Sequence, residues 1–160
     1  MTLHTGDTKT GESCYLPQSA SSSADGTLIR TSCATIGMNN EGCAFLDKSE
    51  ESYGEGFNNV GGGVYAHLWN EKGITVWRFS RNNIPQDITN KTPNPSSWPR
   101  PVAYFPSTNC NMATFFSRHN LVLDTTLCGD WAGGAYPQSK CPLSCAEYVL
   151  DPNNFIGEPS

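Results

Sequence analysis

Charged residues are scarce in this 160-residue sequence. Asp, Glu, Lys and Arg together make up 16% of it, against about 25% in an average soluble domain. The ten Lys and Arg residues form no basic run, and the formal net charge is -5. Binding to nucleic-acid phosphates or to an anionic membrane requires a concentrated positive surface, so we expect neither partner.

Long apolar runs are also lacking. No stretch approaches the roughly 18 apolar residues that a membrane-spanning helix needs. The segment 1–7 has neither the charged nor the apolar region of a signal peptide. Disorder is not expected either, because aromatic residues reach 11% and the polarity comes from Asn, Ser, Thr and Gly. The composition therefore predicts one loop-rich β domain over residues 1–160.

The signatures of common catalytic sites are missing as well. The sequence has no Gly-x-Ser-x-Gly elbow, no phosphate-binding loop and no dinucleotide fingerprint. Among the glutamates, only Glu51 and Glu55 come near the spacing of a paired acid and nucleophile. Their Ser- and Gly-rich surroundings predict a solvated loop and ordinary surface carboxylates. We therefore expect no catalytic residue and no cofactor in this chain.

Cysteine, by contrast, is abundant. The seven cysteines are Cys14, Cys33, Cys43, Cys110, Cys128, Cys141 and Cys145. The spacing of Cys141 and Cys145 would suit a metal, but no second close pair of Cys or His accompanies it. We therefore predict structural disulfides with one thiol left over, and no metal site. A disulfide-rich chain without an export signal is expected to be an internal part of a secreted protein.

The strongest local pattern is an alternation of period two in residues 64–69 and again in 74–79. The turn-forming segment 70–73 lies between them, so the two segments are predicted to form a β-hairpin. On the second strand, one face is expected to carry Ile74, Val76 and Arg78, and the other Thr75, Trp77 and Phe79. Shorter strands are expected at 27–30, 102–105 and 121–127.

Two segments are predicted to be loops and one a helix. Ser19–Ala24 is low in complexity and is expected to be a mobile loop. Five prolines in 82–101 argue against a helix or a central strand there, and Asn90-Lys-Thr forms an N-glycosylation sequon. A helix is expected over 144–150, because Ser144 and Glu147 have the spacing of a capping box. Short strands, long loops and one short C-terminal helix predict an all-β sandwich.

Aromatic side chains are the candidates for contacts with sugars, because their faces stack on the apolar faces of sugar rings. The candidates are Tyr65, Trp69, Trp77, Trp98, Trp131 and Tyr136. Trp69 and Trp77 lie in alternating strands and are expected in the core. Trp131 lies in Gly129–Gly134, where the surrounding glycines are expected to make a loop.

A series of motifs in a fixed order carries a family resemblance. The motifs are Met1–Thr5, Ser52–Asn58, Gly61–Ala66, Ile74–Phe79, Ile84–Ile88, Pro95–Trp98, Leu127–Gly133 and the Cys141…Cys145 pair. Together they cover nearly the whole chain and resemble the downstream part of fungal laminarinase-like endo-1,3(4)-β-glucanases of glycoside hydrolase family 16. The resemblance implies a concanavalin-like jelly-roll β-sandwich, incomplete in this chain, with an open cleft for β-glucan.

The same resemblance locates what the chain has and what it lacks. The family hydrolyses β-glucans with retention by means of a Glu-x-Asp-x-x-Glu strand, which matches no position here, so the chain is expected to be inactive by itself. His4 would lie near the sugar next to the scissile bond, and Trp131 would line the cleft. Asn58 and the triplet Gly61, Gly62 and Gly63 would form its wall.

Two other functions stay open: a non-catalytic β-glucan-binding module, and a secreted disulfide-rich structural protein. The resemblance favours a laminarin-like β-glucan as the partner and an extracellular location, and indicates no oligomeric state. An incomplete jelly roll is expected to leave unpaired strand edges and an uncovered apolar face, and therefore to be marginally stable or to associate.

Overall fold

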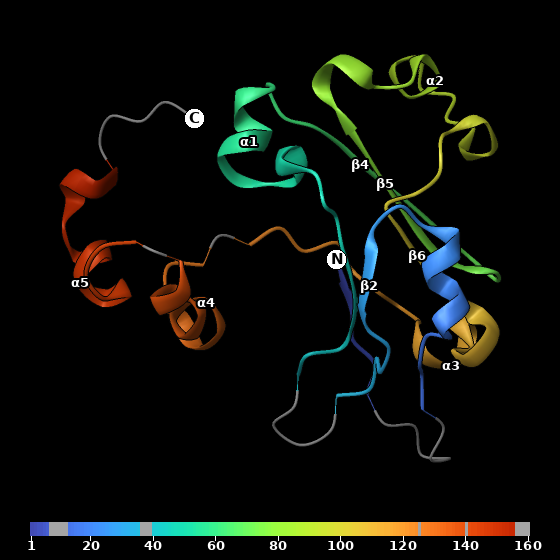
Figure 1. Cartoon of the computed structure of the whole chain (residues 1–160), viewed down its shortest axis with the longest axis horizontal. Helices are drawn as coiled ribbons and strands as arrows, with labels where there is room; N and C mark the ends of the chain where they lie inside the picture. The colour runs from blue at the N-terminus through green and yellow to red at the C-terminus, as the bar shows by residue number, and fades with distance from the viewer. Residues whose placement is uncertain (7–12, 36–39, 125, 140, 156–160) are drawn as a thin grey trace. The chain divides into compact units, whose positions relative to one another are not determined.

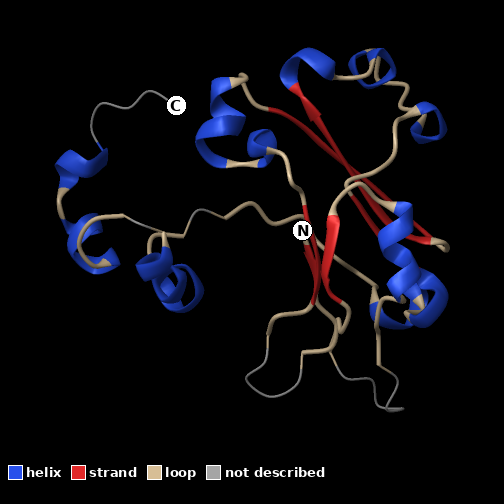
Figure 2. Cartoon of the chain, in the orientation of Figure 1, coloured by secondary structure: helices blue, strands red, loops and turns tan. Residues whose placement is uncertain are grey.

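The computed structural model of the chain contains two compact units, Met1–Arg118 and His119–Ser160, which Figure 1 traces in colour along the chain. It describes residues 1–6, 13–35, 40–124, 126–139 and 141–155, with the backbone alone described at Trp131 and Phe155. Within these residues all strands belong to the first unit (Figure 2).

The first unit is built on two antiparallel three-stranded sheets, one in the order β1-β3-β2 and the other in the order β4-β5-β6. The strands are β1 (Thr2–Leu3), β2 (Thr27–Arg30), β3 (Cys43–Leu46), β4 (Gly63–Asn70), β5 (Gly73–Ser80) and β6 (Ala103–Pro106). The strands expected at 27–30 and 102–105 are therefore present, the second displaced by one residue.

The predicted hairpin is confirmed as β4 and β5. Its register runs without a shift from Gly63 opposite Ser80 to Asn70 opposite Gly73. Gly73 has φ +142°, and an added Cβ would lie 2.2 Å from the Phe105 carbonyl oxygen of β6. Only glycine allows this approach, so the turn fixes the hairpin against the third strand of the sheet.

Side chains from both sheets meet in one apolar core. Phe45 of β3 packs edge-to-face on Phe105 of β6, with the ring centroids 5.4 Å apart. Val76 and Ala103 point into the same core and are also buried. Val76 and Trp77 lie on opposite faces of β5 and both are buried, so each face of this strand is covered.

Short helices connect the strands. The α-helices are α1 (Gly54–Asn59), α2 (Gln86–Thr89), α3 (Met112–Phe115), α4 (Gly129–Ala135) and α5 (Cys145–Leu150). The 3₁₀ turns are η1 (Gln18–Ser23), η2 (Glu50–Ser52), η3 (Arg81–Asn83), η4 (Pro95–Ser97), η5 (Ser107–Asn109), η6 (Tyr136–Gln138) and η7 (Pro152–Phe155). The single C-terminal helix that the sequence predicts is α5, and the other helices are additional. No helix in the described ranges has both the length and the apolar character needed to cross a bilayer.

The expectation of a mobile loop at Ser19–Ala24 is wrong, because most of this segment forms η1. Ala20 and Ala24 are buried in the core. Arg100 donates hydrogen bonds to the carbonyls of Ser22 and Ala24, the latter at 2.9 Å. Burial and backbone hydrogen bonding, which composition does not reveal, order this serine-rich segment.

The proline-rich segment 82–101 is an ordered connection, as expected, but it includes the single-turn helix α2. Pro85 precedes the helix instead of interrupting it, in the position where a missing N–H has no cost. Asp87 then accepts hydrogen bonds from the Asn94 backbone N–H at 2.6 Å and from the Trp98 indole at 2.7 Å. These bonds join α2 to the later part of the same connection.

The second unit contains the predicted helix α5, whose capping box is present. The Ser144 side chain accepts from the Glu147 backbone N–H, and the Glu147 carboxylate accepts from the Ser144 backbone N–H. The helix ends at Leu150, before Asp151 and Pro152, as predicted.

Two other expectations for this unit are wrong. Gly129–Gly134 lies in helix α4 instead of a loop, because Cys128 and Gly129 both have positive φ and turn the chain into the helix, and Asp130 lies in its first turn. The segment 121–127 forms no strand among its described residues, and Thr125 lies outside them. Leu121 and Leu123 are 90% and 91% exposed; strand propensity is realised only against a neighbouring strand.

The predicted disulfides are confirmed for six of the seven cysteines. The bonds are Cys14–Cys110, Cys33–Cys43 and Cys128–Cys145. The leftover thiol is Cys141, which is exposed. Two bonds lie within the first unit and one within the second.

Candidate functional site

The predicted residues Asn58, Gly61, Gly62 and Gly63 meet in one tight corner between α1 and β4. The Gly61 N–H donates to the Asn58 carbonyl at 2.9 Å, and the Gly62 N–H donates to the Phe57 carbonyl at 2.8 Å. Gly61 and Gly62 have φ of +76° and +78°, a conformation that favours glycine. The glycine triplet is therefore required for the chain to reverse here.

The end of β5 holds this glycine corner in place. An added Cβ on Gly63 would lie 2.2 Å from the Phe79 carbonyl oxygen, so the two strands approach too closely for any other residue. Arg81 donates from its backbone N–H to the Gly62 carbonyl and from Nε to the Gly61 carbonyl, both at 2.9 Å. Asn58 and Gly61 remain exposed, so the corner is a fixed, accessible edge.

A charged network that the sequence did not predict lies beside the corner. Arg78 donates from Nε to the Asp47 carboxylate at 2.6 Å, and both side chains are about nine-tenths buried, with 12% and 11% exposed. Arg78 also donates to the Ser80 hydroxyl at 3.1 Å, and that hydroxyl donates to the Glu51 carboxylate. Arg78 on the same face as Val76 was the available signal, since a buried cation requires an anionic partner.

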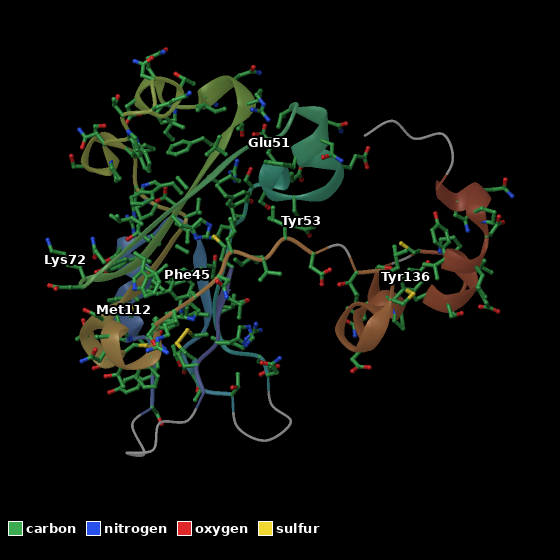
Figure 3. All side chains as sticks on the ribbon, turned by 180° about the vertical axis from the view of Figure 1, so that it is seen from behind. Phe45, Glu51, Tyr53, Lys72, Met112 and Tyr136 are labelled. Carbon is green, nitrogen blue, oxygen red and sulfur yellow. A yellow bond between two sulfur atoms is a disulfide. The ribbon has the colours of Figure 1, made fainter. Side chains whose placement is uncertain are left out.

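The expectation that Glu51 and Glu55 are ordinary carboxylates in a solvated loop is wrong for Glu51. Residues 50–52 form η2, the Ser49 hydroxyl accepts from the Glu51 backbone N–H at 3.2 Å, and Glu51 is half-buried. Figure 3 marks its place beside α1. Glu55 is exposed on α1. The Ser80 hydroxyl thus donates to one of these carboxylates, while the other lies exposed.

Tyr65 lies opposite Arg78 of this network in the β4–β5 register. Its hydroxyl donates to the Ser52 carbonyl. Burial raises the pKa of Tyr65, the charge of Asp47 raises it further, and Arg78 opposes the shift. The phenol therefore stays neutral.

A hollow of about 350 Å³ borders the network, and its lining includes Glu51 and Asn83. Their carboxylate and amide groups can hydrogen-bond a hydroxyl-rich ligand.

His4 follows β1 and is exposed. Its Nδ1 lies 3.0 Å from the Asn40 side-chain oxygen. Among the described residues, no hydrogen bond joins His4 to the glycine corner. Trp131 lies in α4 of the second unit, and its side chain is outside the described residues. The predicted sugar-binding roles of both residues stay predictions.

The structure sorts the other aromatic candidates. Trp77 is 6% exposed, as predicted, and donates from its indole to the Pro99 carbonyl at 2.9 Å. Trp98 packs edge-to-face on Trp77 at 5.1 Å and donates to Asp87. Contacts within the fold therefore hold both indoles in place. The backbone N–H of Asn94, together with the Trp98 indole, lowers the pKa of Asp87. The prediction that Trp69 is a core residue is wrong, since 47% of it is exposed.

Tyr136 in the second unit contacts Tyr148, with the ring centroids 6.3 Å apart, and donates its hydroxyl to the Pro142 carbonyl at 3.0 Å. Asn90 is exposed at the C-terminus of α2, and its side-chain oxygen accepts from Gln86. Its glycosylation stays a prediction. The described residues contain no group of three or more His, Cys, Asp or Glu side chains placed to hold a metal ion.

Comparisons with known proteins match these features to one family. The model of the XgeA-like catalytic domain of glycoside hydrolase family 16 matches residues 1–157. A probable glycosidase of Schizosaccharomyces pombe is 42% identical over 159 residues, which are 97% of this chain and 36% of that protein. The endo-1,3(4)-beta-glucanase xgeA of Emericella nidulans is 42% identical over 118 residues, 73% of this chain and 18% of that protein.

Solved structures agree. Laminarinase 16A from Phanerochaete chrysosporium, described with two beta-glucans in its donor and acceptor sites, superposes with a TM-score of 0.85 at 37% identity, over 96% of this chain and 51% of that chain. This chain thus spans about half of the laminarinase and a smaller share of the two curated relatives. The predicted jelly-roll class is confirmed. The chain belongs to glycoside hydrolase family 16, in its XgeA-like group.

Proposed function

We propose that this chain supplies part of the glucan-binding surface of an endo-1,3(4)-β-glucanase and carries none of its catalytic carboxylates. The single observation behind the proposal is that the family match extends over residues 1–157 while the sequence contains no Glu-x-Asp-x-x-Glu. Retaining hydrolysis needs two carboxyl groups about 5–5.5 Å apart, and in this proposal Glu51, which Ser80 binds, and the exposed Glu55 are not that pair. The chain alone is therefore inactive, and its partner is a laminarin-like β-glucan.

The sugar contacts in this proposal come from His4, Asn58, the glycine corner and Trp131. The corner suits the role because it is fixed by backbone hydrogen bonds and exposes the Asn58 amide. A preformed edge loses little conformational freedom on binding. Three disulfides support an extracellular location, where such bonds persist.

Two assays on the purified 160-residue chain test the proposal. Release of reducing sugar from laminarin is expected to equal the protein-free blank. Retention on insoluble β-1,3-glucan is expected for the unsubstituted chain and is expected to fall at least fivefold in Trp131→Ala, because an aromatic platform contributes about 1 kcal/mol or more. Retention is expected to fall less in His4→Ala.

Tyr53→Ala is the matched control, because Tyr53 is 79% exposed and belongs to none of the predicted contacts. Hydrolysis above the blank would refute the claim that the chain lacks catalysis. Retention that Trp131→Ala and Tyr53→Ala lower equally would refute the assignment of Trp131. A folded chain that glucan does not retain would refute glucan binding.

A further inference from the structure

The tip of the β4–β5 hairpin carries an open pocket that neither His4, Asn58, the glycine triplet nor Trp131 lines. Its volume is about 460 Å³, within the range of small-molecule sites. Its lining includes Trp69, Asn70, Glu71, Ser107, Asn111 and Phe116. In Figure 3, Lys72 at the hairpin tip and Met112 of α3 mark the same end of the first unit.

An aromatic platform forms the apolar side of this hairpin-tip pocket. Trp69 is 47% exposed, while Phe116, which meets it edge-to-face at 6.3 Å, is only 8% exposed. Met112, another lining residue, is 5% exposed. Buried apolar groups thus support the indole while nearly half of its surface faces solvent. A supported, exposed indole can stack on the face of a pyranose ring whose C–H bonds point toward it.

The rim of the pocket is polar but almost uncharged. Asn111 uses its side-chain oxygen to accept from the backbone N–H groups of Ala113 and Thr114, at 2.9 and 3.2 Å. Its amide nitrogen is therefore available as a donor, while Glu71 supplies an acceptor and Ser107 both. No cationic side chain lines the pocket among the described residues. This combination suits hydroxyl groups and not phosphates.

Both walls of the pocket are fixed in advance. The Lys72 carbonyl accepts from the Ser107 backbone N–H at 3.0 Å and from the Tyr104 hydroxyl at 3.1 Å, which ties the hairpin tip to the end of β6. On the other wall, Asn111 caps α3 and follows Cys110, which is bonded to Cys14. Such walls need little ordering when a ligand binds.

A second hollow of about 410 Å³ adjoins the first, because Ser107 and Asn111 line both. Tyr15, which lines the second hollow, is 49% exposed. Each hollow therefore has one exposed aromatic side chain in its lining, and the two hollows share Ser107 and Asn111. That arrangement suits successive rings of an oligosaccharide better than a single monosaccharide.

We propose that the hairpin-tip pocket binds a glucosyl ring of a β-glucan chain, with Trp69 as the stacking platform and Asn111 as a hydroxyl-binding residue. The identity of the sugar rests on the proposed function. The pocket itself rests on the geometry of Trp69, Asn111 and Phe116.

The test is a titration of laminaritriose into the unsubstituted, ¹⁵N-labelled chain, followed through the indole N–H signals of its four tryptophans. Each signal is assigned with a Trp→Phe variant. The Trp69 signal is expected to shift saturably. Trp69→Ala is expected to weaken laminaritriose binding about tenfold, as followed through the signals of the other residues that line this pocket. Trp69→Phe is expected to weaken it less.

Asn111→Asp is the matched variant, because Asp caps a helix as well as Asn while its carboxylate replaces the amide donor. It is expected to weaken binding about threefold, the effect of a lost neutral hydrogen bond, and to leave the unfolding midpoint unchanged. Sorbitol, which has hydroxyl groups but no ring, is expected to leave the Trp69 signal in place.

The outcomes separate this inference from the proposed function. A Trp131 signal that shifts while Trp69 stays fixed overturns the hairpin-tip pocket and leaves the proposed function standing. An equal shift of Trp69 with sorbitol overturns the stacking role. If no indole signal shifts with laminaritriose, both this inference and the proposed glucan binding are overturned.

Discussion

In the first unit, the side chains of two sheets meet in an apolar core that includes Phe45, Val76 and Phe105. In the second unit, none of the described residues is buried. Its order comes from the Cys128–Cys145 bond, the α5 capping box and local hydrogen bonds. Segments near roughly 40 residues rarely bury enough apolar surface to fold on that basis alone. The first unit is therefore stabilised mainly by long-range burial, and the second by covalent and local contacts.

The largest expected effect is loss of the Cys14–Cys110 bond, which joins residues 96 apart in the sequence. Cys14→Ser with Cys110→Ser is expected to lower the free energy of unfolding of the first unit by about 4–5 kcal/mol, because the bond restricts a long loop in the unfolded chain. Urea unfolding followed by Trp fluorescence measures it. A loss below about 1 kcal/mol would show that this bond does not stabilise the core.

Phe45→Ala comes next. Phe45 is 1% exposed and packs on Phe105, so its truncation is expected to cost about 3–5 kcal/mol through lost burial and a cavity. The matched control in the second unit is Leu123→Ala, which removes an aliphatic side chain that is 91% exposed. It is expected to change stability by less than about 0.5 kcal/mol. Equal costs in the two variants would contradict the contrast between the units.

The third prediction concerns the Cys128–Cys145 bond, which joins residues 17 apart. Cys128→Ser with Cys145→Ser is expected to destabilise the second unit by about 3 kcal/mol. Amide hydrogen exchange is expected to show faster exchange in α4 and α5 and unchanged protection in β4 and β5. Faster exchange in both units would mean that they unfold as one.

The smallest expected effect is the dependence of folding stability on pH, in which the two units are expected to behave alike. In the second unit, the side chain of Ser144 and, to a smaller extent, its backbone N–H hydrogen-bond Glu147 and lower the pKa of this carboxyl group. In the first unit, the Asn94 backbone N–H lowers the pKa of Asp87. Glu147 is exposed and Asp87 is only partly buried, so both effects are small. Because the pKa of each carboxyl group is lower in the folded state, its contribution to the free energy of unfolding is fully present above the unfolded-state pKa, about 4. That contribution is lost as pH falls through the folded-state pKa.

NMR titration of the two side-chain carboxyl carbons measures these pKa values. Ser144→Ala is expected to return the Glu147 midpoint toward its ordinary value and to leave Asp87 unchanged. A Glu147 midpoint that does not move in this variant would contradict the role of the capping box.

The features that the sequence predicted correctly depend on neighbours along the chain. The β4–β5 hairpin follows from alternation and a turn, and α5 from the spacing of Ser144 and Glu147. The positive φ angles of Gly61 and Gly62 likewise arise within a few consecutive residues, although the role of this corner in sugar binding stays a prediction. Each of these patterns needs only a few consecutive residues to specify its hydrogen bonds.

The features that the sequence missed depend on distant residues. The residues around Glu51 have the composition of a loop, yet Ser80, which is distant in the sequence and ends β5, donates a hydrogen bond to its carboxylate. Trp69 and Trp77 each lie in a segment that alternates with period two. Trp98 packs on Trp77, however, while Trp69 stays 47% exposed. The segment 121–127 has strand propensity, but no described strand pairs with it. Periodicity reports which residues share a face and not what covers that face.

The sequence by itself determined the family, the absence of a Glu-x-Asp-x-x-Glu strand and the local hydrogen-bonded elements, because each is a matter of residue type and spacing. Only the tertiary structure decided which cysteines pair, which aromatic residues are buried and which form the hairpin-tip pocket. Those outcomes depend on packing between segments far apart in the chain, where the competing arrangements differ in burial and not in local propensity.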